Sequence, residues 1–89
     1  MALQNVIKLE KDLWNAHVEF MGVDNDMAEM YAQDRNDVIE ANGLWKAGKI
    51  AELKTHINRL DTSIREGVVI AFAEDLGSQW VEEQLGWSV

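Results

Sequence analysis

Residues 3–21 read LQNVIKLEKDLWNAHVEFM, and this stretch decides the fold class. When its residues are placed at 100° intervals, the polar side chains occupy an arc of about 120° and the apolar side chains about 200°. A surface helix needs an apolar arc of only a little over about 100°. We therefore expect a helix over 3–21 that is central in the protein or lies at an interface between copies of the chain.

Two polar residues, Glu10 and His17, fall inside this apolar face. A separation of seven residues places them about 10.5 Å apart along the helix axis, so each needs a different partner. Arg35, Tyr31 or the same residues of a second copy could satisfy their hydrogen bonds. Alternatively, the two residues could line a pocket for a polar ligand. One histidine and one distant acid are too few ligands for a metal site, and we expect no cofactor.

Turn residues delimit a second helix. Gly22 can adopt the left-handed conformation that ends the first helix. Asp24, Asn25 and Asp26 then offer alternative N-caps, and Asp26 and Glu29 have the spacing of a capping box. The pattern predicts a second helix over 27–41, with Asn42-Gly43 closing it and a connector after it that holds Trp45.

The second half of the chain contains three further helical segments. Over 49–60, apolar residues alternate at three-residue and four-residue steps, which predicts a helix covered by one neighbour. A last short helix is predicted over 79–85, after which Gly86 lets Trp87 fold back on the protein. Between these two segments lies the most apolar part of the sequence.

This apolar part leaves its secondary structure open. Residues 68–73 could form a buried strand, because a short apolar run does not define a period. Ser63 and Glu66 have capping-box spacing and favour a helix over 64–76 that ends before a glycine. The predicted fold is therefore all-α: one domain over 1–89, built as an irregular bundle of four to five short helices and oligomeric.

Composition limits the classes of partner. Sixteen acidic residues against eight Lys and Arg give a net charge of −8, which argues against direct nucleic-acid binding and favours a basic or neutral protein partner. The chain has no cysteine, so no disulfide or thiolate metal site stabilises it. It shows neither a signal peptide nor an apolar run of about 18 residues. We expect a cytoplasmic protein with no membrane contact.

Three sets of residues are candidates for function. Glu29, Asp37 and Glu40 form an acidic face on the second helix, which could contact a basic partner or simply face solvent. A possible ligand site consists of Glu10, His17, Tyr31 and Arg35. The predicted interface lies on the first helix and consists of Leu13, Trp14, His17, Glu10, Phe20 and Met21.

Signatures of catalysis are missing from the sequence. It contains no zinc-protease motif, no glycine-rich phosphate loop and no nucleophile elbow, so we expect no enzyme activity. The leading hypothesis is a small acidic interaction protein that binds and modulates or inhibits another macromolecule, as accessory or phage-type inhibitors and adaptors do. The alternative is a homo-oligomeric module that binds a small polar ligand, such as a nucleotide, between subunits.

Overall fold

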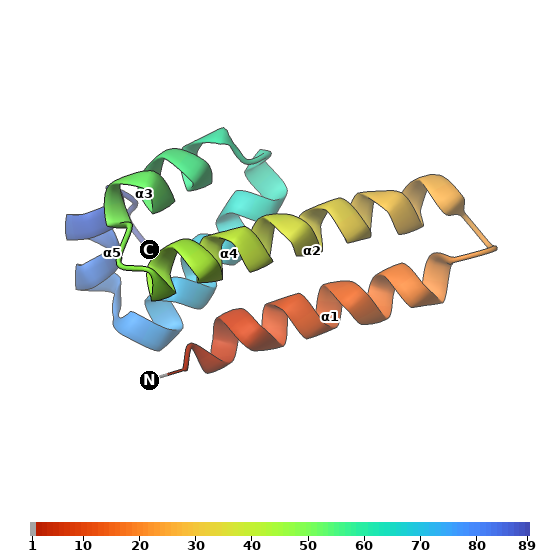
Figure 1. Ribbon diagram of the computed structural model, residues 1–89, viewed down its shortest axis with the longest axis horizontal. Helices are drawn as coiled ribbons and strands as arrows, with labels where there is room; N and C mark the ends of the chain where they lie inside the picture. The colour runs from red at the N-terminus through yellow and green to blue at the C-terminus, as the bar shows by residue number, and fades with distance from the viewer. Residues whose placement is uncertain (1) are drawn as a thin grey trace.

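Five helices form the computed structural model, which describes residues 2–89 (Figure 1). They are α1 (Gln4–Phe20), α2 (Asn25–Lys46), α3 (Ile50–Arg59), α4 (Thr62–Leu76) and α5 (Ser78–Leu85). Residues 2–89 contain no strand, so the all-α prediction is confirmed and 68–73 are helical.

The longest helices, α1 and α2, run antiparallel as a hairpin, and α3 to α5 gather around one end of it (Figure 1). At about 1.5 Å per residue, the 22 residues of α2 extend about 33 Å. The other three helices have 10, 15 and 8 residues and cluster at the end where α2 finishes. The far half of the hairpin therefore projects, and the molecule measures 42 × 25 × 23 Å.

The core lies where all five helices meet. Its fully buried side chains are Leu3, Val6, Val38, Leu53, Ile57, Val68, Phe72, Val81 and Leu85. Within α1, only Val6 near the start of the helix is buried. The expectation of a central first helix is therefore met only at its N-terminal end.

The predicted end of the second helix is wrong. Gly43 adopts ordinary helical geometry, and α2 continues to Lys46. Gly48 follows the C-cap residue Ala47 and has a φ of +72°, which suits glycine and turns the chain away from the helix. Backbone hydrogen bonds then close the end of the helix. In that closure Gly48 N–H donates to the Trp45 carbonyl and Lys49 N–H to the Leu44 carbonyl. Packing of Leu44 and Trp45 against the core offsets the poor helix propensity of Gly43.

Both predicted capping boxes are also wrong. The N-cap of α2 is Asp24, whose carboxylate accepts a hydrogen bond from Met27 N–H at 3.2 Å, so Asp26 lies inside the helix. The N-cap of α4 is Asp61, and its side chain makes no capping bond. The helix thus begins before Ser63, which leaves no role for the Ser63 and Glu66 pair as a box.

The C-terminal segment folds back as predicted. Gly86 is left-handed with φ of +75°, and Trp87 packs partly buried against the core. Trp87 Nε1 donates to Asn58 Oδ1 at 3.1 Å, and the Arg65 guanidinium lies 4.6 Å from the Trp87 ring. These contacts tie the end of the chain to α3 and α4.

The N-terminus of α1 is capped by a residue from another helix. Leu3 occupies the N-cap position and has no polar side chain to offer. Instead, the carboxylate of Asp75 in α4 accepts hydrogen bonds from Asn5 N–H and Val6 N–H at 3.0 Å, and from Asn5 Nδ2 at 2.8 Å. A carboxylate in this place satisfies orphan N–H groups and complements the positive end of the helix dipole.

We predict that Asp75→Ala lowers the free energy of unfolding by about 1–3 kcal/mol, because half-buried N–H groups of α1 lose a charged acceptor. Urea denaturation followed by circular dichroism measures the change. Glu74→Ala, at the exposed neighbouring position, is the control and should shift stability by no more than about 0.5 kcal/mol. Equal shifts in the two variants would contradict this account of the cap.

Candidate functional site

The two polar residues in the apolar face of α1 both find partners on α2. Arg35 Nη2 donates to Glu10 Oε1 at 3.1 Å, and the same guanidinium lies 4.9 Å from the Trp14 ring. His17 Nδ1 lies 2.7 Å from the Ala28 carbonyl, so the imidazole donates there. The hairpin therefore satisfies these groups within one chain.

The six residues of the predicted interface fall into two groups. Leu13 packs against the core, and the Phe20 ring stacks on Tyr31 with centroids 5.7 Å apart, so the chain itself covers both side chains in part. Trp14 and Met21, in contrast, are 46% and 56% exposed. The exposed part of the predicted interface therefore lies on a different side of α1 from Leu13.

The exposed apolar side chains of α1 and of its C-cap residue form one line, which we call the outer stripe. It consists of Ile7, Trp14, Val18 and Met21, with exposed fractions of 38, 46, 49 and 56%. Ile7 and Val18 were not among the predicted interface residues. Ile7 lies seven residues before Trp14, and Val18 lies four residues after Trp14 and three before Met21. This spacing was the signal that could have found them.

Each residue of the predicted ligand site contacts another group of its own chain. Glu10 and Arg35 pair with each other, His17 bonds to the backbone, and Tyr31 stacks on Phe20. Three grooves on the surface of residues 2–89 are lined by other residues. Within residues 2–89, no group of three His, Cys, Asp or Glu side chains is placed to hold a metal ion.

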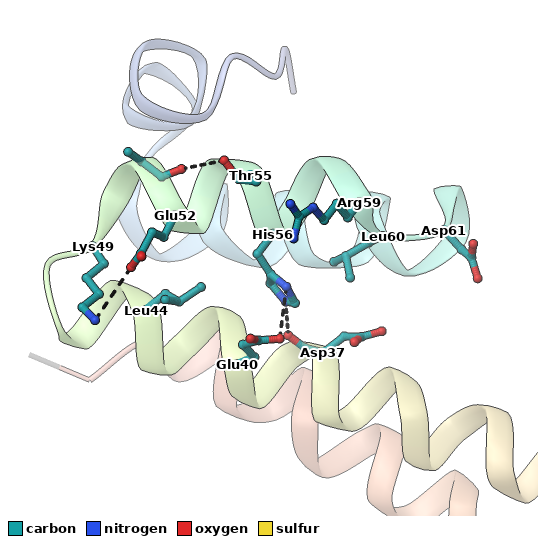
Figure 2. Close-up of a pocket in the computed structure, with 11 residues that line it drawn as sticks. Asp37, Glu40, Leu44, Lys49, Glu52, Thr55, His56, Arg59, Leu60 and Asp61 are labelled. Carbon is teal, nitrogen blue, oxygen red and sulfur yellow. Dashed lines mark hydrogen bonds and ion pairs between the residues drawn. The ribbon is translucent and has the colours of Figure 1, made fainter.

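The largest of these grooves lies between α2 and α3 and has a volume of about 880 Å³ (Figure 2). His56 reaches across it to α2, where Nε2 lies 2.9 Å from the Asp37 carbonyl and Nδ1 3.2 Å from Glu40 Oε2 (Figure 2). The ring thus lies between a backbone carbonyl and a carboxylate of α2. The sequence places His56 at the edge of the α3 seam beside solvent, so it was not among the candidate residues, and its contacts with α2 were not predicted.

The predicted acidic face of α2 is largely exposed. Glu29 and Glu40 are both exposed, although the Glu40 carboxylate also contacts His56. Asp37 is partly buried and accepts a hydrogen bond from Gln33 Nε2 of the same helix at 3.2 Å. A further acid, Asp34, lies partly buried close to them. Burial raises the pKa of the Asp34 carboxyl, and the negative charges of Asp37 and Asp61 raise this pKa further.

Comparisons of the chain with protein-family models, curated protein sequences and solved structures found no match. Inspection of the helices within residues 2–89 finds none with the length and apolar character needed to cross a bilayer.

We predict that Asp34→Asn stabilises the protein at about pH 7 and leaves its stability unchanged near pH 3. The folded-state pKa of Asp34 lies above its unfolded value, so ionisation costs folding free energy at pH values above that pKa. Below the unfolded value the carboxyl is protonated in both states, and the cost vanishes. Urea denaturation at both pH values measures the difference. A destabilised Asp34→Asn variant at neutral pH would show that the ionised carboxylate is favourable in the fold.

Proposed function

We propose that this protein is a small acidic interaction protein, without enzyme activity, that acts by associating with another macromolecule. The outer stripe carries the proposal: it leaves four large apolar side chains at least 38% exposed along one helix of an 89-residue chain. Isolated exposed apolar residues are normal on any protein, whereas a contiguous apolar patch is typical of a contact surface. The patch lies on a hairpin that projects from the bundle, where a partner can reach it (Figure 1).

Charge supports a protein partner. The net charge of −8 and the exposed Glu29 on the same hairpin favour a basic or neutral protein over nucleic acid. Binding of this kind suits a cytoplasmic accessory factor, such as an inhibitor or adaptor of the phage type.

The alternative, a small polar ligand such as a nucleotide between subunits, has less support. The four residues predicted to bind it are engaged by groups of their own chain, as described above. The groove between α2 and α3 offers cations at Lys49 and Arg59, but Glu52 pairs with Lys49, and Asp37 and Glu40 add negative charge to the same walls. An anionic ligand would meet these acids.

The test uses two variants at positions of equal exposure. Val18 in the outer stripe and Ile70 on α4 are both 49% exposed, so Val18→Glu and Ile70→Glu add the same charge to equally accessible sites. We predict that the tagged wild type and Ile70→Glu capture the same macromolecule from cells of the source organism. Val18→Glu should capture at least about tenfold less of this macromolecule, because burying an unpaired carboxylate in an apolar contact is strongly unfavourable.

Equal capture by both variants would overturn the proposal that the outer stripe mediates the function. A wild type that captures nothing, yet melts reproducibly higher with a nucleotide or metabolite, would favour the small-ligand alternative, since a ligand that binds the native state raises stability.

A further inference from the structure

A second line of residues, on α2, has the same spacing as the outer stripe. With Lys11 included, the stripe follows positions 7, 11, 14, 18 and 21, which alternate steps of four and three. On α2 the same alternation links Ala32, Asn36, Ile39 and Gly43, and all four are exposed or only partly buried. Such alternation keeps one face of a helix against a neighbour, as in coiled coils.

The two lines lie on the same side of the hairpin. On α1, Glu10 and His17 face α2 while Leu9 faces Gly67 of α4, which leaves the outer stripe on the side away from α4. On α2, Arg35 faces α1 and Asp37 faces α3. The remaining direction on α2 is the one that carries the line through Ile39. Together the two lines form what we call the outer face.

We propose that a second copy of this chain packs on the outer face, so that two hairpins form an antiparallel four-helix bundle. This inference rests on the proposed function, because it takes the outer stripe as a contact surface and assigns that surface to a second copy; a further partner would then contact the acidic α2 surface that the dimer leaves exposed. Two observations select a second copy running antiparallel: the distribution of charge beside the outer stripe, and the sizes of the side chains along α2.

Charge along and beside the outer stripe is complementary to itself when reversed. Lys11 lies on the line of the stripe in the first half of α1, and Glu19 lies beside that line in the second half. Lys8 adds no free charge, because it is already paired with Asp12 of the same helix at 2.9 Å. An antiparallel pair centred on Trp14 sets Ile7 opposite Met21 of the second copy, which brings Lys11 of each chain close to Glu19 of the other. A parallel pair would oppose Lys11 to Lys11, and like charges across a contact are unfavourable.

Side-chain sizes on α2 fit the same register. The Arg35 guanidinium lies over the Trp14 ring, so an axis beside Trp14 crosses α2 near Asn36. Ile39, which is 40% exposed, then lies opposite Ala32 of the second copy, a large residue against a small one. Asn36 faces its own counterpart, where one polar position in an apolar seam fixes the register of helices. At Gly43 an added Cβ would meet nothing within 4 Å, so the single chain leaves this end of the face open.

Engineered cysteines test the arrangement directly, because the chain has none of its own. We predict that a mixture of purified Ile7→Cys and Met21→Cys forms a disulfide between the two variants under mild oxidation. Each variant alone should cross-link at least about tenfold less, since the geometry of a disulfide requires Cα atoms within about 7 Å. Ile70→Cys, on α4, is the control and should not cross-link above background. Dominant cross-linking of Ile7→Cys to itself would overturn the antiparallel arrangement.

Charge reversal tests the pairing without cysteines. Lys11→Glu and Glu19→Lys should each weaken the dimer by about tenfold or more, and an equimolar mixture should recover it as a heterodimer in which both pairs are restored. Lys54→Glu on α3 is the matched control and should leave the dimer intact. Sedimentation and light scattering give the particle masses, and circular dichroism shows that each variant is folded.

A wild-type protein that is monomeric at about 100 μM would overturn the dimer. If such a monomer still captured a macromolecule in a manner sensitive to Val18→Glu, the proposed function would stand while this inference failed. A wild-type dimer that captured nothing else would leave the inference intact and count against the proposed function. The dimer carries two copies of the acidic α2 surface. Loss of the dimer therefore also weakens the binding of a partner that contacts both copies.

Discussion

The difference in length between the hairpin and the helices that pack on it governs this structure. A helix can bury an apolar face only along the distance over which a neighbour runs, and α3 to α5 are too short and too clustered to follow α1 and α2 to their turn. Burial is therefore concentrated at one end, where Val6, Val38 and Phe72 meet. Apolar side chains of the hairpin beyond that end stay exposed, because no neighbouring helix runs beside them there.

The polar groups between the two helices of the hairpin are paired within the chain, whereas apolar side chains on its outer face stay exposed. Arg35 contacts a polar and an apolar side chain at once, because its guanidinium pairs with Glu10 and also covers part of the Trp14 ring. His17 is held by a backbone carbonyl. On the side of the stripe that faces α2, a molecule that approaches the outer face thus meets exposed apolar side chains beside a charge pair that the chain has already formed, which lowers the desolvation cost of forming a contact.

Periodicity predicted the helices well, because it reflects burial that is local along the chain. The apolar steps of α3, the glycine stops at Gly22 and Gly77, and the excess width of the α1 face could all be read from the sequence. Tertiary contacts decided the rest. Gly43 stays helical because Trp45 is held by the core, and no local pattern could show that Asp75 caps a helix 70 residues earlier. Nor could periodicity show which part of the wide face the chain covers itself, and so Ile7 and Val18 were overlooked.

The capping of α1 by Asp75 also sets an order of events during synthesis. The hairpin consists of local contacts and has all its residues by Lys46, whereas the anchor of its first turn requires α4. Until Asp75 has been made and has docked, the start of α1 has no carboxylate on its free N–H groups, and the core that surrounds Val6 is incomplete. A chain truncated before α4 therefore keeps the sequence of the hairpin but lacks the group that fixes its first turn in place.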